Sequence, residues 1–88
     1  MLVGDEHQLK GLVPRRCSVE IVHAGDAIAM DEKATAIRRK KDSSLYRTLE
    51  LVRDKEASAA VSCGHTGALL VGSVLLLGII EGVERPAI

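Results

Sequence analysis

The 88 residues of the chain suffice for one small domain, and 47% of them are apolar, an ordinary fraction for a globular protein. Twelve lysines and arginines balance twelve aspartates and glutamates, so recognition of a partner through a large net charge is disfavoured. Tyr46 is the only residue of the Phe, Trp and Tyr group, which disfavours nucleic-acid binding by base stacking, so no nucleic-acid partner is predicted.

The N-terminal part of the chain predicts a strand, a helix and a second strand. The pair 2–3 reads as the end of a strand, and a helix follows over 7–13 with Asp5 as its N-cap. Apolar and polar side chains alternate over 17–23, which is typical of a strand, and a turn follows at 24–26.

The middle of the chain predicts two helices. A short helix is expected over 32–39. A longer one begins among residues 42–44, because all three side chains there are of the types that cap helix N-termini. Its apolar residues Leu45, Leu49 and Val52 recur with helical spacing and predict one buried face.

The last third of the chain predicts a strand, a polar turn and a buried helix. The apolar run 59–62 reads as the strand, and the apolar stretch from Gly67 to Ile80 as the helix, with Thr66 as its N-cap. Residues 87–88 are expected to begin a further strand. Helices that alternate with short apolar strands indicate an α/β fold with a parallel sheet.

The glycine-bracketed turn before this last helix is a candidate anion site. Glycine lets the main chain approach a ligand, and the first N–H groups of a helix are free to bind an anion. Gly64, His65 and Thr66 therefore predict a corner for a phosphate or a carboxylate. His65 is suited to act as a general acid or base, or to donate to an oxyanion. The alternative interpretation is an ordinary strand-to-helix turn.

Four adjacent cations at 38–41 precede the other helix start. Such a run is usually a solvated face or the positively charged end of a helix. Beside free N–H groups and the hydroxyls that follow, the same cations would suit a phosphate or an acyl phosphate. Both interpretations stay open on the sequence alone.

Residues 57–80 contain no Asp, Glu, Lys or Arg, and this window is long enough to cross a membrane. Its first half is small and polar, however, and the strictly apolar part at 68–80 has the length of a core helix. A small single-span membrane protein is therefore an alternative of lower weight.

The two cysteines show no metal-binding spacing, so the sequence predicts no metal site and no cofactor. The N-terminus lacks the basic region and apolar core of a signal peptide, which favours free thiols in a reducing cytoplasm. Cys63 is expected to be a small packing residue.

Two segments resemble a known family. One is Arg39-Lys40-Lys41-Asp42-Ser43-Ser44, and the other is Val61-Ser62-Cys63-Gly64-His65-Thr66-Gly67-Ala68-Leu69-Leu70. Together with shorter matches at 2–5, 21–24, around 30–31 and at 82–87, they occur in the order found in PlsX, the acyl-acyl-carrier-protein:phosphate acyltransferase family of bacterial phospholipid synthesis. The resemblance runs almost from end to end. Within it, Cys63 stands where the family usually has Ala, and His65 where it usually has Asn.

This resemblance implies a larger three-layer α/β/α fold of the isocitrate-dehydrogenase and phosphotransacetylase type. Residues 1–88 would be a single partial α/β domain, an internal fragment of a longer enzyme and inactive alone. The implied reaction is attack of inorganic phosphate on the thioester of acyl-acyl-carrier protein, which releases an acyl phosphate for fatty acid and phospholipid synthesis. The implied enzyme is a cytoplasmic homodimer with peripheral association at the inner face of the cell membrane.

The resemblance also assigns the site. The predicted substrate-binding residues are Lys40, Lys41, Asp42, Ser43, Ser44, Gly64, Thr66 and Gly67, and the predicted catalytic residue is His65. The lysines would supply charge, the serines hydroxyl contacts, and the turn N–H donors for phosphate or the thioester oxyanion. No residue is predicted as a covalent nucleophile, which suits direct attack by phosphate. The alternative function is a non-catalytic α/β interaction module that docks through its apolar part.

Overall fold

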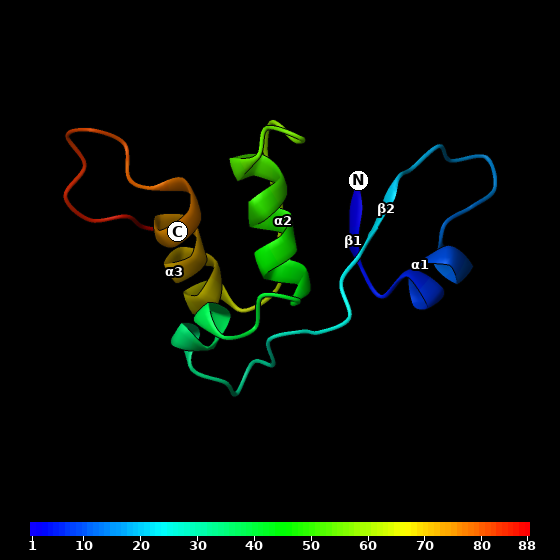
Figure 1. The fold of residues 1–88 in the computed structure, drawn as a ribbon, viewed down its shortest axis with the longest axis horizontal. Helices are drawn as coiled ribbons and strands as arrows, with labels where there is room; N and C mark the ends of the chain where they lie inside the picture. The colour runs from blue at the N-terminus through cyan, green and yellow to red at the C-terminus, as the bar shows by residue number, and fades with distance from the viewer.

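The computed structural model describes all 88 residues. Its elements, in chain order, are β1 (Leu2–Gly4), α1 (Glu6–Leu12), β2 (Ile21–His23), the 3-10 helix η1 (Ala34–Arg38), α2 (Ser44–Arg53) and α3 (Thr66–Leu77). Figure 1 shows the two strands and α1 at one end of the molecule and α2, α3 and η1 at the other. The predicted α/β class is confirmed.

β1 and β2 form a parallel pair in which Leu2 lies opposite Ile21 and Gly4 opposite His23. Parallel strands need a crossover connection, and α1 provides it while contacting both strands. The carboxylate of Asp5 accepts a hydrogen bond from the His7 N–H at 2.9 Å and caps α1, as the sequence predicted.

The hydrophobic core lies between η1, α2 and α3. Its four buried members are Ile37, Leu45, Leu49 and Ala68. α3 approaches the other two elements closely at Gly72, because a Cβ there would lie 2.4 Å from Ile37 Cδ1 and 2.7 Å from Leu49 Cδ1. Only a residue without a side chain allows this approach.

α2 and α3 both begin at the lower edge of the view in Figure 1, the same edge at which the two strands end. The carboxyl ends of the strands and the amino ends of the two longest helices therefore lie at the same edge. In α/β proteins, ligands bind at such an edge. The fold thus selects one side of the molecule for the site.

Three predicted strands differ in the structure. β2 covers 21–23 and not 17–23, since its only partner, β1, is three residues long. No strand forms at 59–62 or at 87–88, where the backbone makes no ladder hydrogen bonds. An apolar run supplies side chains for a strand but not its partner, so these two predictions were wrong.

The predicted helices also shift at their ends. The helix expected over 32–39 is the 3-10 turn η1. The N-cap of α3 is His65 and not Thr66, and the helix stops at Leu77 because Gly78 adopts a φ of 80° that breaks the helical path.

α3 is less buried than predicted. Of its twelve residues only Ala68 and Gly72 are buried, and Leu75 is 51% exposed, because one helix face alone contacts α2 and η1. Cys63 is exposed, so the prediction that it packs was wrong. None of the helices combines the length and the hydropathy that a membrane crossing requires.

Candidate functional site

The first motif forms the start of α2, with Ser43 as its N-cap. The Ser43 side chain is completely buried, and its Oγ accepts a hydrogen bond from the Tyr46 N–H at 3.3 Å. The Ser44 N–H donates to the Asp26 carbonyl at 3.0 Å, and the Asp26 N–H to the Asp42 carbonyl at 3.2 Å. The amino end of α2 is thereby fastened to the segment that follows β2.

Lys40 lies within an intramolecular clamp. Its Nζ is 2.6 Å from Glu32 Oε1, 3.0 Å from the Ala27 carbonyl oxygen and 3.7 Å from Asp26 Oδ1. The hydrogen bond between Lys40 and Glu32 is the main cause that raises the pKa of Lys40 and lowers the pKa of Glu32. An ammonium group has three hydrogens to donate, so these partners engage it within the chain.

Glu32 also contacts the second motif, through its backbone. Its carbonyl oxygen lies 2.7 Å from His65 Nε2, while His65 Nδ1 accepts a hydrogen bond from the Ala68 N–H at 3.1 Å. A carbonyl oxygen only accepts and a backbone N–H only donates, so these partners require a neutral imidazole with its proton on Nε2. Glu32 thus joins the two motifs: its carboxylate binds Lys40 and its carbonyl binds His65.

The turn before α3 keeps part of the predicted anion corner. The Gly64 N–H donates to Ser62 Oγ at 3.1 Å, and that of Ala68 is used by the cap. The N–H groups of Thr66 and Gly67 make no hydrogen bond within the chain. Two donors therefore remain at the helix start, where the helix dipole favours negative charge.

Gly67 is required here for packing against η1. A Cβ at this position would lie 3.0 Å from the Ala34 Cβ, closer than such atoms normally approach. The glycine therefore lets the turn reach the segment that carries Glu32. This close approach supports the hydrogen bond between Glu32 and His65.

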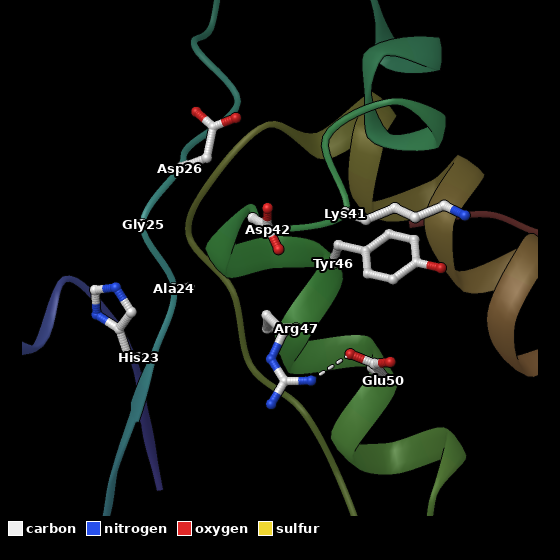
Figure 2. Close-up of a pocket in the computed structure, with 9 residues that line it drawn as sticks. All are labelled: His23, Ala24, Gly25, Asp26, Lys41, Asp42, Tyr46, Arg47 and Glu50. Atoms are coloured by element: carbon white, nitrogen blue, oxygen red, sulfur yellow. Dashed lines mark hydrogen bonds and ion pairs between the residues drawn. The ribbon is translucent and has the colours of Figure 1, made fainter.

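A pocket of about 730 Å³ opens at the carboxyl end of β2, between this strand and α2 (Figure 2). The residues that line it are His23, Ala24, Gly25, Asp26, Lys41, Asp42, Tyr46, Arg47 and Glu50. Of the predicted site residues, only Lys41 and Asp42 belong to this set. The turn at 64–67 does not line it, and Ser44 lines a neighbouring pocket together with Asp5 and Gln8.

The charges of this pocket are partly paired. Arg47 Nη1 donates to Glu50, which also accepts from Arg53 Nη2 at 3.1 Å. Figure 2 shows Lys41 extended beside the Tyr46 ring, away from the strand side of the pocket. Arg47 is turned toward the space between β2 and α2. The arrangement brings charged and polar side chains of two different elements to one open cleft.

Sequence reasoning missed His23 and Arg47 as site residues. His23 is the last residue of β2, and side chains at strand ends in an α/β fold face the ligand-binding edge. That position was therefore a signal available in the sequence. No pattern in the sequence indicated Arg47, because its position near β2 depends on how α2 packs against the strand.

All 88 residues match the protein family described as fatty acid synthesis protein. The chain is 50% identical over 92 residues to a phosphate acyltransferase of Pelotomaculum thermopropionicum, 48% over 92 residues to one of Myxococcus xanthus and 44% over 92 residues to one of Gloeothece citriformis. Each alignment covers 100% of this chain but only 27%, 26% and 26% of these relatives, respectively. The chain thus spans about a quarter of the length of the curated relatives it matches.

Proposed function

The chain belongs to the fatty acid synthesis protein family, and we propose that it forms part of a phosphate acyltransferase. In the proposed reaction, an oxygen of inorganic phosphate attacks the carbonyl carbon of an acyl thioester on a carrier protein. The carbon–sulfur bond then breaks, and the sulfur takes up the proton that the phosphate gives up. The products are an acyl phosphate and the free carrier thiol.

The observation that carries this proposal is the bridge made by Glu32. It joins Lys40 and His65, one from each motif, within hydrogen-bond distance of a single residue. Both helix starts consequently keep fixed positions at the edge where the strands end. Acyl transfer needs such fixed donors, because negative charge develops on the thioester oxygen in the transition state.

Each part of this edge has a proposed role. The N–H groups of Thr66 and Gly67, which have no partner within the chain, donate to the thioester oxyanion. His65 orients them as the cap of their helix, and Lys40 is a positioning residue for the same turn through Glu32.

Lys41 and Asp42 act on the phosphate from the pocket. Lys41 lines the pocket and adds positive charge on its α2 side, with its ammonium directed away from β2 (Figure 2). The Asp42 carboxylate makes no ion pair within the chain and accepts the proton of the phosphate hydroxyl, which makes the attacking oxygen more nucleophilic; this proton then passes to the departing sulfur.

The partners and location of the whole enzyme are part of the same proposal. The substrates are acyl-acyl-carrier protein and inorganic phosphate, the assembly is a homodimer, and the enzyme works in the cytoplasm at the inner membrane surface. The names of the relatives support the phosphate acyltransferase activity, and the resemblance described above supports the rest.

The test is phosphate-dependent release of carrier-protein thiol by the intact enzyme. We expect a thiol signal that rises with phosphate concentration and forms in equal amount to acyl phosphate. Sulfate in place of phosphate is the matched control and should give only background release. Binding of acyl-acyl-carrier protein without any thiol release would contradict the proposal and favour the non-catalytic interaction module.

A further inference from the structure

We propose that His65 makes the start of α3 sensitive to pH: protonation of its ring releases the helix start, so the oxyanion donors are held in place only while the ring is neutral. This inference rests on the proposed function, because those donors are the N–H groups of Thr66 and Gly67. It goes beyond that function by assigning a control on the site. The hydrogen bonds of the ring, the burial of Ala68 and the packing around Gly67 carry it.

Both nitrogens of the His65 ring have partners of fixed chemistry. Nε2 lies 2.7 Å from the Glu32 carbonyl oxygen, which can only accept, and Nδ1 lies 3.1 Å from the Ala68 nitrogen, whose hydrogen can only be donated. A second proton can bind only to Nδ1, because Nε2 already carries one. Two N–H groups then face each other at the cap, and no hydrogen bond can join them.

The Ala68 N–H finds no replacement partner when this hydrogen bond is lost. Ala68 is 0% exposed, so water does not reach its backbone while the helix start stays in place. A buried N–H without a partner costs free energy comparable to that of a lost hydrogen bond. The start of α3 therefore moves away from η1 to expose this group, and the N–H groups of Thr66 and Gly67 move with it.

The ring cannot restore the cap by turning in place. A Cβ at Gly67 would lie 3.2 Å from His65 Cε1 and 3.0 Å from the Ala34 Cβ, so the ring, the turn and η1 are closely packed. A half-turn of the ring about its Cβ–Cγ bond exchanges Nδ1 for a carbon, which accepts no hydrogen bond. Neither orientation of the protonated ring caps Ala68.

The charges of the neighbouring elements do not compensate for the lost cap. η1 and α2 pack against α3, which itself carries no charged side chain. The carboxylates of residues 32–53, which contain η1 and α2, are Glu32, Asp42 and Glu50. The cations of the same residues are Lys33, Arg38, Arg39, Lys40, Lys41, Arg47 and Arg53, and Tyr46 is also titratable. Glu32 is paired with Lys40, Glu50 with two arginines, and no ion pair involves His65. The protonated ring thus gains no carboxylate in exchange for the cap.

Two variants isolate the titration of His65. In His65→Asn, the amide oxygen caps Ala68 at every pH, because an amide does not titrate. The matched control is His7→Asn, which changes an exposed histidine of α1. The third histidine, His23, is present in all the proteins compared. Glu32 stays ionised in mild acid, because its hydrogen bond with Lys40 lowers its pKa from the usual 4.5.

The first readout is phosphate-dependent thiol release by the intact enzyme. Histidine side chains change charge between about pH 5 and pH 8. We expect the ratio of parent activity to His65→Asn activity to fall about tenfold between about pH 7.5 and about pH 5.5, because each pH unit of titration changes the neutral fraction about tenfold. His7→Asn should behave as the parent. The titration of phosphate affects all the proteins equally and cancels in the ratio. A ratio that stays constant would overturn the proposal.

The second readout, hydrogen exchange of the Ala68 amide in the intact enzyme, separates this inference from the proposed function. We expect the protection factor to fall about tenfold over the same pH interval in the parent and in His7→Asn, and to stay constant in His65→Asn. Loss of protection without thiol release at any pH would uphold the release of the helix start and refute the acyltransferase. Thiol release with unchanged protection in the parent would overturn the pH effect and leave the acyltransferase standing.

Discussion

The two helix starts at the ligand edge differ in how their N–H groups are used. At α2, the Ser44 N–H binds the Asp26 carbonyl and the Tyr46 N–H binds the Ser43 hydroxyl, which is buried. At α3, the cap uses the Ala68 N–H, and the N–H groups of Thr66 and Gly67 have no partner within the chain. Both segments carry family motifs, but the α3 start leaves two N–H groups without a partner within the chain, whereas the α2 start leaves only that of Leu45, a buried residue.

Because of this difference, the two motifs have different roles. The α2 start is a structural anchor that presents side chains, Lys41 and Asp42, to the pocket. The α3 start presents backbone dipoles, and its capping side chain has both ring nitrogens engaged. A small polar residue in a motif can therefore act on the ligand indirectly, by fixing the backbone beside it.

The largest effect is expected from separating the two helices at Gly72. Gly72→Ala places a methyl group on Ile37 and Leu49, and we expect the free energy of unfolding to fall by about 1–3 kcal/mol. Gly11→Ala is the control: nothing lies within 4 Å of a Cβ there, and helix propensity should raise stability by up to about 1 kcal/mol. Urea denaturation measures both. Equal effects of the two changes would show that α2 and α3 do not approach at this point.

The next effect tests the anchoring role of the α2 start. Ser43→Ala removes the cap that the Tyr46 N–H uses, so we expect a loss of about 1 kcal/mol in unfolding free energy. Ser58→Ala, at an exposed position, should be nearly neutral. A Ser43→Ala enzyme with parent stability and a raised KM for phosphate would instead mean that the hydroxyl contacts the substrate.

A smaller effect is expected at the α3 start, where the chain carries a histidine cap. His65→Ala should lower the free energy of unfolding by about 0.5–1 kcal/mol. His65→Asn should keep stability, because an amide oxygen also caps a helix, and it should keep or raise acyltransferase activity. Thiol release and urea denaturation, run on the same samples, give both readouts. Complete loss of activity in the asparagine variant would contradict the capping role.

The smallest effect concerns the ion pair between Glu32 and Lys40, and it depends on pH. Lys40 lowers the pKa of Glu32 in the folded protein, so this carboxylate adds stability above its unfolded pKa of 4.5, and the gain is lost as pH falls through the lower folded value. Glu32 raises the pKa of Lys40 in the folded protein. The contribution of Lys40 to stability is therefore fully present below its unfolded pKa of 10.5, and it is lost as pH rises through the higher folded pKa.

We therefore expect Glu32→Gln to be less stable than the parent enzyme at about pH 6 and to approach it at about pH 3. Unfolding free energies at the two pH values give the comparison, with exposed Glu20→Gln as the control. A stability difference that does not narrow in acid would show that the ion pair with Lys40 does not form.

Much of the local structure was predictable from neighbouring residues. Asp5 before α1 and Ser43 before α2 cap the helices as expected, because a cap acts over only two or three residues. The cap at His65 was missed, since histidine is not a common capping type. The strand expected at 59–62 was wrong because a strand needs a partner, which no local pattern supplies.

The sequence by itself determined the α/β class, the helix starts, the resemblance to the acyltransferase family and the two segments that carry it. Only the tertiary structure decided that Glu32 joins Lys40 to His65, which lies 33 residues after Glu32, and that His23 and Arg47 line one pocket. The physical reason is distance along the chain. Caps and periodicity act within one or two turns, whereas a pocket is formed by elements whose relative placement depends on how the core packs.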